Sequence, residues 1–173
     1  MTRVLKAECQ KNATRHIEPV VFIGGPIMHA IMRGSYNGPL REAIELTIRT
    51  VESHGCHVRS AITEGYLSHG VSFEPGGFSE QTFRDHNGVV EACCYIGVWP
   101  SEGGVAMRSD GMCVEIGWAT QSAVPCILIR DLSAKYSDII LGLNSVGKVQ
   151  HLDYAEFLSD SRKLLTLLDV ALA

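Results

Sequence analysis

The 173-residue sequence lacks several patterns that would assign it to a common class of protein. No apolar run approaches the roughly 20 residues that a membrane helix needs, and the first 18 residues are polar and mixed in charge, unlike a signal peptide. There is no G-x-x-x-x-G-K-[ST] phosphate loop, no G-x-S-x-G nucleophile elbow and no G-x-G-x-x-G dinucleotide motif. These absences argue against a membrane protein, a P-loop enzyme, an elbow-type serine hydrolase and an NAD enzyme, and we expect a cytoplasmic protein.

An excess of basic residues is also missing. The net charge is −4, whereas binding to nucleic acid relies on clusters of Lys and Arg, so nucleic acid is not the expected partner. The six cysteines contain no C-x-x-C pair, and four of them lie in apolar runs. This usage favours buried free thiols in a reducing compartment over disulfides or a zinc site. We expect no metal and no cofactor.

What the sequence does contain is an alternation of strand-like and helix-like segments. The length fits one domain, which we place at residues 19–173 after a polar arm at residues 1–18. Apolar runs predict strands at residues 19–23, 57–62, 93–99, 125–129 and 148–152. Helical spacing predicts helices from Leu40 to Gly55 and over 79–92, 111–122 and 154–172, with a short helical turn at 137–142. Residues 63–78 and 100–108 are expected to be loops. The pattern predicts an α/β fold: a single doubly wound sheet of about five parallel strands, Rossmann- or flavodoxin-like.

The segment Ser109–Ala119 stands out, because it opens a helix after a buried strand, where open α/β sheets place ligands. Glu115 lies there among core-type residues, Gly111 leaves the backbone accessible, and Ser109 places a hydroxyl ahead of the helix. A structural interpretation is that Ser109 or Asp110 caps the helix and Glu115 is a surface residue. That interpretation accounts for the cap but fits the apolar neighbours of Glu115 poorly, so the pattern favours a functional site.

Other candidate residues are less distinctive. Asp85 lies early on a predicted helix, where an acid favoured by the helix dipole is the simpler interpretation. Phe22 is on a buried strand and is more often a core residue than an aromatic platform for a ligand. Gly24 and Gly25 follow that strand, but without the dinucleotide spacing they are weak evidence for a nucleotide site.

Taken together, these blocks resemble a known family. The similarity lies in Val21-Phe22-Ile23-Gly24-Gly25-Pro26, Asp85, Gly111-x-x-x-Glu115-Ile116-Gly117-Trp118-Ala119 and Gly142-Leu143-Asn144-Ser145. They are similar to the nucleoside 2-deoxyribosyltransferase superfamily, and more closely to its nucleoside 5′-monophosphate N-glycosidases. Within those, the chain most resembles the cytidylate and hydroxymethylcytidylate hydrolases of nucleoside-antibiotic biosynthesis. The resemblance covers roughly residues 20 to 152.

The resemblance implies roles for individual residues. Glu115 matches the carboxylate that attacks or stabilises C1′ of the sugar, and Asp85 matches an acid near the sugar and base. Ser109 and Gly111 match positions that hold the 5′-phosphate. Ser145 matches a serine that reaches the phosphate bound by a neighbouring subunit, which implies a homodimer.

The strand–loop segment that includes Phe22 is expected to contact the phosphate, sugar and base. Gly25 would contribute to the phosphate site, and Phe22 and Ile27 to the site for base and sugar. Phe22 stands where the transferases have tyrosine and the cytidylate hydrolases have phenylalanine. The hydroxymethylcytidylate hydrolases carry an arginine soon after Gly-Gly-Pro, whereas this chain has Ile27, Met28 and His29.

The expected function is therefore hydrolysis of the N-glycosidic bond of a pyrimidine nucleoside 5′-monophosphate, with CMP as the favoured substrate. The products would be free base and ribose 5-phosphate, made by a metal-free homodimer that uses neither nucleic acid nor membrane. One alternative is a nucleoside 2-deoxyribosyltransferase, which moves deoxyribose between bases. Another is a catalytically idle nucleotide-binding module. The sequence leaves open ribose against deoxyribose, the 5-substituent of the base, a covalent intermediate and the proton donor to the leaving base.

Overall fold

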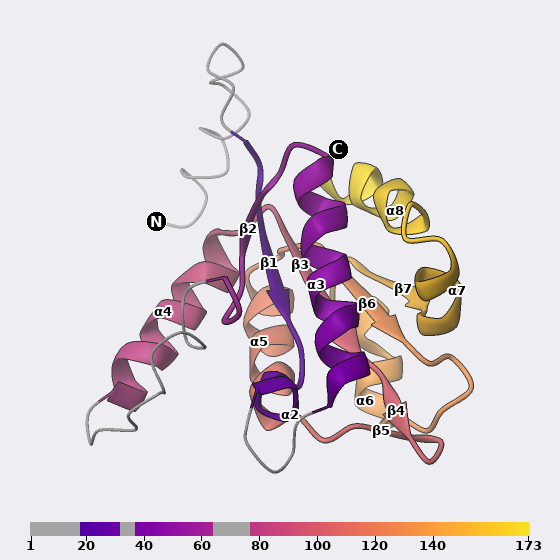
Figure 1. Cartoon of the computed structure of the whole chain (residues 1–173). Helices are drawn as coiled ribbons and strands as arrows, with labels where there is room; N and C mark the ends of the chain where they lie inside the picture. The colour runs from indigo at the N-terminus through magenta and orange to yellow at the C-terminus, as the bar shows by residue number, and fades with distance from the viewer. Residues whose placement is uncertain (1–17, 32–36, 64–76) are drawn as a thin grey trace.

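A five-stranded parallel sheet forms the centre of the protein. The computed structural model describes residues 18–31, 37–63 and 77–173 (Figure 1). The strand order is β2-β1-β3-β6-β7, and every neighbouring pair is parallel. The strands are β1 Val20–Gly24, β2 His57–Arg59, β3 Cys94–Trp99, β6 Cys126–Arg130 and β7 Val149–Asp153. All five lie within or beside the predicted segments, so the predicted fold class is confirmed.

Helices cover both faces of this sheet. One face is covered by α3 Gly38–Ser53, α7 Tyr154–Ser159 and α8 Lys163–Leu172. The other is covered by α4 Gly77–Glu91 and α5 Asp110–Gln121, which also pack against each other. Figure 1 shows α3 in front of the sheet and α5 behind it. Among the helices of the described ranges, none is long and apolar enough to cross a membrane.

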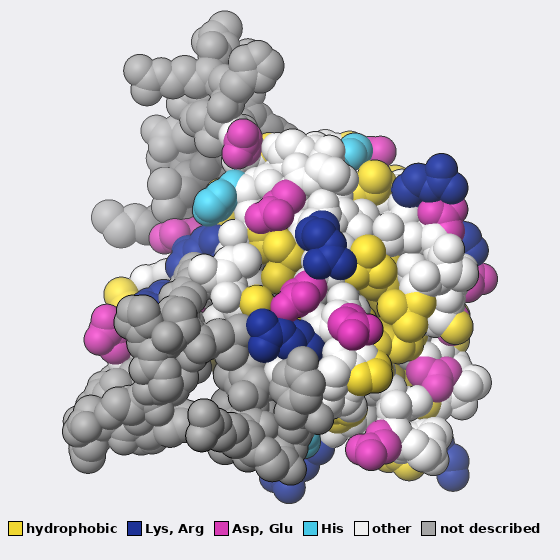
Figure 2. All heavy atoms as spheres, viewed as in Figure 1, with side chains coloured by type: hydrophobic (Ala, Val, Ile, Leu, Met, Phe, Trp, Pro, Cys, Tyr) yellow, Lys and Arg dark blue, Asp and Glu magenta, His cyan; other side chains and the backbone are white. Residues whose placement is uncertain are grey.

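Short elements complete the ends of the strands. They are α2 Ile27–Ile31 after β1, and α6 Asp138–Leu141 and the 3-10 turn η1 Leu143–Ser145 between β6 and β7. The helical turn predicted at 137–142 is thus found, with the Ser137 side chain accepting a hydrogen bond from the Ile140 backbone N–H. Figure 2 shows that Lys, Arg, Asp and Glu side chains intermingle on the viewed face. Part of this mixture is the Arg41–Glu45–Arg49 ladder on α3.

Two predicted segments differ from the structure. The predicted helix 154–172 is two helices, because Asp160 adopts an extended backbone and its carboxylate accepts hydrogen bonds from the backbone and side chain of Arg162. The predicted loop 100–108 contains a small hairpin, β4 Ser101–Glu102 and β5 Val105–Ala106. Gly103 and Gly104 form its turn with φ of +59° and +78°, which glycine adopts without the penalty of a side chain.

Other boundaries shift by a few residues. The strand predicted to reach residue 62 ends at Arg59, because Ser60 and Thr63 close a turn through mutual hydrogen bonds. The helix predicted from Ser79 begins at Gly77. The arm predicted at residues 1–18 lies, apart from Glu18, outside the described residues, as does most of the predicted loop 63–78.

The segment between β3 and α5 is tied to the ends of the strands. The Trp99 indole N–H donates to the carbonyl of Met107 at 2.6 Å, and the Tyr136 hydroxyl donates to the carbonyl of Trp99 at 2.6 Å. Arg130, at the end of β6, lies over the Tyr136 ring at 4.9 Å. These contacts fix where the chain enters α5, and therefore where Ser109 and the first turn of that helix lie.

Candidate active site

The carboxyl ends of β1 and β3 form the switch point of the sheet. The chain leaves β1 toward β2 on one side and leaves β3 toward β6 on the other. In sheets of this order, ligands bind in the crevice outside the carboxyl ends at that point. Gly24 ends β1 and pairs in register with Gly97 of β3, so two residues without side chains adjoin at this place. The candidate ligand site is therefore the region around Gly24.

Glu115 points at this place from α5. Its Oε2 accepts a hydrogen bond of 2.9 Å from the hydroxyl of Tyr95, a completely buried residue of β3. A side chain at Gly24 would collide with both Glu115 Oε2 and the Tyr95 hydroxyl. The absence of a side chain at Gly24 is therefore what allows the carboxyl group to rest against the end of β1.

Glu115 as a whole is half-buried, and the surroundings of its carboxyl group favour the neutral form. Burial raises the pKa of Glu115 from 4.5 to about 8; the hydrogen bond from Tyr95 opposes this shift, and the negative charge of Asp85 adds to it. Burial, together with the neighbouring Glu115, raises the pKa of Tyr95 well above its ordinary value. The phenol of Tyr95 therefore remains a hydrogen-bond donor at neutral pH. A carboxyl group with such a shift at a switch point is a candidate for chemistry.

Asp85 joins the site from α4. Its charge acts on the pKa of Glu115, so the structure brings together the two acids that the sequence singled out. The contact between α4 and α5 is fixed beside it by the His86 ring, which meets the Trp118 ring edge-on at 5.2 Å between centroids. Gly111, Glu115 and Trp118 follow one another at spacings of four and three, which places them along one face of α5.

The first turn of α5 has the features of an anion site. Ser109 is the N-cap, and its hydroxyl oxygen accepts from the Met112 backbone N–H at 3.3 Å. A side chain at Gly111 would meet open space. Asp110 is exposed and paired with Arg108 through bonds of 3.2 and 3.0 Å. Of the two cap residues considered from the sequence, Ser109 is therefore the cap, while Asp110 lies at the surface.

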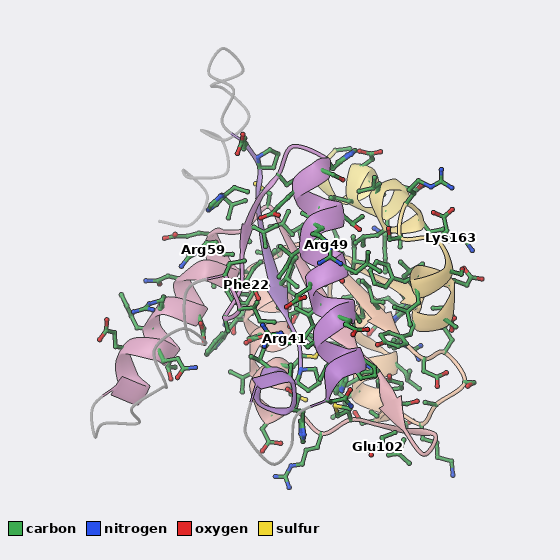
Figure 3. The ribbon with its side chains drawn as sticks, in the orientation of Figure 1. Phe22, Arg41, Arg49, Arg59, Glu102 and Lys163 are labelled. Carbon is green, nitrogen blue, oxygen red and sulfur yellow. The ribbon has the colours of Figure 1, made fainter. Side chains whose placement is uncertain are left out.

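The other predicted contact residues have clear local surroundings. Phe22 is buried, with its ring stacked on Tyr95 at 6.1 Å, and Gly88 of α4 lies so close that a side chain there would strike the Phe22 ring. Figure 3 shows Phe22 on β1 with Arg59 on the neighbouring strand. Phe22 thus supports Tyr95 from within the core.

Gly25 and Ile27 follow β1. Gly25 is buried, and a side chain there would meet the Val98 carbonyl and Ile44 of α3, on the opposite face of the sheet from Glu115. Ile27 begins α2, is partly buried against the core, and donates its backbone N–H to the Gly25 carbonyl at 2.7 Å. Their predicted contacts with phosphate, sugar and base stay predictions.

Ser145 lies at a different place in the sheet. It is exposed on η1, which packs beside the edge strand β7, and its hydroxyl donates to the Gly142 carbonyl at 2.7 Å. Strand β7 is three positions from β1, or about 14 Å at the usual spacing of strands. The single chain therefore gathers Glu115, Asp85 and the start of α5, and leaves Ser145 apart from them.

Metal-ligand chemistry has no obvious place in the described part of the chain. Within residues 18–31, 37–63 and 77–173, no three His, Cys, Asp or Glu side chains gather closely enough to hold an ion. Free thiols are buried at Cys56, Cys94 and Cys126, whereas Cys113 on α5 is exposed. The predicted burial of cysteines in apolar runs is confirmed for Cys94 and Cys126 and is wrong for Cys113.

Two parts of the site were missed from the sequence. Tyr95 lies within the apolar run of β3, where its hydroxyl gives no signal, and Gly24 was considered only as part of a nucleotide loop. The available clue was that side chains along a strand alternate between the two faces of the sheet. Phe22, Gly24, Tyr95 and Gly97 alternate with residues that face α3, so in-register parallel pairing places all four on the α5 side.

Strand order, helix layers and a carboxyl group at the switch point define an open α/β protein of the flavodoxin-like order with its candidate site beneath the start of α5. Solved structures of other proteins share this fold, including the following two. A CMP N-glycosidase of Clostridium botulinum superposes with a TM-score of 0.57 at 22% identity, over 87% of this chain and 98% of that one. A 2-deoxyribosyltransferase of Bacillus psychrosaccharolyticus superposes with a TM-score of 0.54 at 15% identity, over 79% and 88%. The resemblance predicted from the sequence is therefore confirmed at the level of the fold. No protein-family model and no curated protein sequence matches the chain.

Proposed function

We propose that this protein hydrolyses the N-glycosidic bond of a pyrimidine nucleoside 5′-monophosphate, with CMP as the favoured substrate. The observation that carries the proposal is the position of the Glu115 carboxyl group. Tyr95 holds it at the switch point of the sheet, and it lies on the same helix as the N-cap Ser109. The fold shared with a CMP N-glycosidase supports the same substrate class. We further propose that the enzyme needs no metal or cofactor and acts in the cytoplasm.

In the proposed reaction, the bond between C1′ and the base nitrogen breaks and its electron pair leaves with the base. Positive charge develops at C1′, where the Glu115 carboxylate forms an ester bond or stabilises the charge. Water then adds to C1′ and loses a proton to Asp85 or to solvent, which gives ribose 5-phosphate and, in the ester route, releases the carboxylate. The leaving base takes a proton from Asp85 or from water.

The start of α5 is the proposed phosphate site. Backbone N–H groups at a helix N-terminus favour an anion. The Ser109 oxygen already accepts the capping bond, but its O–H remains a donor that a phosphate oxygen can accept. Six residues separate Ser109 from Glu115, about 9 Å along the helix axis. In this proposal the phosphate lies at Ser109 and Gly111 and is also contacted by the backbone of Gly25 after β1. The sugar lies below it toward Glu115, with Phe22 and Ile27 near sugar and base.

A second subunit completes the proposed site. Gly147, two residues after Ser145, packs against Thr120 near the end of α5, whereas the proposed phosphate site is at the start of that helix, about 16 Å along its axis. Ser145 therefore serves a phosphate more readily in a partner subunit than in its own. Exposed apolar side chains flank it, with Ile139 79% and Val146 72% exposed. Such residues are suited to burial between copies of the chain, which supports a homodimer.

Transfer of deoxyribose between bases is the main alternative, because the second structural neighbour is a 2-deoxyribosyltransferase. Both reactions use a carboxylate at C1′ and differ in the acceptor, which is water or a second base. The Ser109 hydroxyl at the start of α5 favours the hydrolase, since an acid at that position would repel a 5′-phosphate.

The deciding experiment offers the purified protein CMP, dCMP, cytidine, deoxycytidine and the uridine counterparts, with and without a second free base, and measures released base by chromatography. We expect base release from the monophosphates without any added base. Release only when a second base is present would establish the transferase. Binding of CMP without base release from any compound would establish the idle nucleotide-binding module.

A further inference from the structure

We propose that Tyr95 is a positioning residue that holds Oε2 of Glu115 and leaves the other oxygen, Oε1, to face C1′ of the substrate. This inference rests on the proposed N-glycosidase function, and it assigns a role to a side chain that lies in the middle of a core strand. It follows from two contacts that meet at one carboxyl oxygen and from a third that holds Tyr95 itself.

The first two contacts enclose Oε2. The Tyr95 hydroxyl donates a hydrogen bond to that oxygen at 2.9 Å. The backbone of Gly24 lies so close that even a methyl group there would overlap both Oε2 of Glu115 and the hydroxyl oxygen of Tyr95. With one carboxyl oxygen placed between a strand end and a phenol, the carboxyl plane is fixed. Oε1 is then the oxygen that remains for a substrate.

The third contact fixes Tyr95 itself. Its ring is completely buried and stacks on Phe22 at 6.1 Å with an angle of 14° between the planes. Phe22 in turn lies under Gly88, where any side chain would strike its ring. The support therefore runs from α4 through Phe22 and Tyr95 to Glu115, and each member has little freedom to move.

A simpler interpretation is that Tyr95 is a core side chain whose hydroxyl needs an acceptor and finds Glu115. The two interpretations differ in what loss of the hydroxyl does to the reaction: a core hydrogen bond serves the fold alone, whereas a positioning donor also sets the ionisation and the turnover that depend on Glu115. A positioning donor stabilises the carboxylate form, and the bond from Tyr95 does lower the pKa of Glu115 against the effect of burial. The charge of Asp85 on α4 raises the pKa of Glu115, and β1 presents the uncharged Phe22 and Gly24 on this side of the sheet.

The test is Tyr95→Phe, which keeps the ring and its stacking and removes the donor. In the proposed reaction Glu115 acts as an anion, so kcat/KM for CMP rises with pH through the pKa of Glu115. We expect Tyr95→Phe to move that midpoint upward by about one pH unit and to lower kcat about tenfold or more with little change in KM. The matched control is Tyr136→Phe, which removes a buried tyrosine hydroxyl that donates to the Trp99 carbonyl rather than to Glu115, and it should leave the midpoint unchanged.

An unchanged midpoint in Tyr95→Phe, with native circular dichroism, would overturn the proposal. So would an equal shift in Tyr136→Phe, because the effect would then reflect general loosening of the core.

A second measurement separates this proposal from the proposed function. Carbon-13 NMR of the Glu115 side-chain carboxyl, assigned by comparison with Glu115→Gln, reports its titration without any substrate. The buried hydroxyl proton of Tyr95 in the parent protein should shift with the same midpoint. If no compound releases base, the N-glycosidase function fails. If the Tyr95 proton and the Glu115 carboxyl titrate independently, the positioning role fails, whatever the activity and whether or not Tyr95→Phe folds.

Discussion

Replacing Glu115 by Gln should make folding less sensitive to pH, and by an amount that the structure allows us to work out. The folded protein raises the pKa of this carboxyl group from 4.5 to about 8, mainly by burial. The folded chain thus holds the proton more tightly than the unfolded chain does. The contribution of Glu115 to stability is fully present below pH 4.5 and is lost as the pH rises to about 8.

The magnitude follows from the window. At about 1.4 kcal/mol for each pH unit, ionisation of Glu115 weakens folding by at most about 5 kcal/mol once the pH exceeds 8. That is a large part of the roughly 5–15 kcal/mol by which a domain is stable. Glutamine has nearly the same shape, keeps an oxygen that accepts from Tyr95 and has no charge to bury. The variant and the parent should therefore be similarly stable at pH 4, and the variant should be more stable by several kcal/mol at pH 9.

The assay is urea unfolding of both proteins at pH 4, 5, 6, 7, 8 and 9, followed by circular dichroism and analysed for the free energy of unfolding. Glu52→Gln, which removes an exposed carboxylate from α3, is the control and should stay within about 0.5 kcal/mol of the parent at each pH. Parallel curves for the parent and Glu115→Gln, or a difference below about 1 kcal/mol at pH 9, would show that the folded protein does not bury this carboxyl group as described.

Four further changes test the site. Glu115→Ala should abolish base release from CMP with native circular dichroism; near-normal turnover would refute the mechanism. Gly24→Ala should lower the rate of base release about 100-fold, because its methyl group would overlap Glu115. The control Gly117→Ala places its methyl group in open space, so it should keep activity and stabilise α5 by up to about 1 kcal/mol. Equal activities of the two variants would contradict this reasoning. Ser109→Asp should weaken binding of CMP relative to cytidine, since like charges about 4 Å apart repel by about 4 kcal/mol at an effective dielectric of 20; equal rates on CMP and cytidine in the parent would favour the transferase. Ser145→Ala should weaken monophosphates but not nucleosides, with the parent sedimenting as a dimer; a fully active monomer would contradict the shared site.

The sequence was sufficient for the sheet because its signal is local. Apolar runs of five or six residues alternate with segments whose apolar residues have helical spacing, and this alternation leaves few alternatives to a parallel sheet. Strands β3 and β6 are in fact buried at every position. Boundaries were less predictable. Neither proline nor glycine marks the break after Ser159, where the side chain of Asp160 competes for backbone N–H groups.

The reason for which the sequence singles out Glu115 is only partly right. It stood out because its neighbours are apolar, and burial does raise its pKa. Yet Val114 beside it is 49% exposed and Gly117 is exposed as well, so the apolar residues of α5 do not all enclose it. What encloses Glu115 comes from β1 and β3, through Gly24 and Tyr95. Those contacts depend on the register of β1 and β3 and on which face of the sheet each side chain occupies, and a local sequence pattern specifies neither.

The burial that disfavours ionised Glu115 in the resting protein also explains what the carboxylate is worth in the proposed reaction. Charges interact more strongly where water is excluded, so a carboxylate that is costly to form attracts a positive C1′ more than an exposed one would. The Tyr95 hydroxyl and the end of β1 hold the group in place, so little reorganisation is needed when charge develops. In the resting protein Asp85 opposes the effect of Tyr95, because the negative charge of Asp85 raises the pKa of Glu115 whereas the hydrogen bond from Tyr95 lowers it. If water is the proton donor to the base, Asp85 stays ionised in the proposed reaction, and its attraction to the positive C1′ then offsets its repulsion of Glu115.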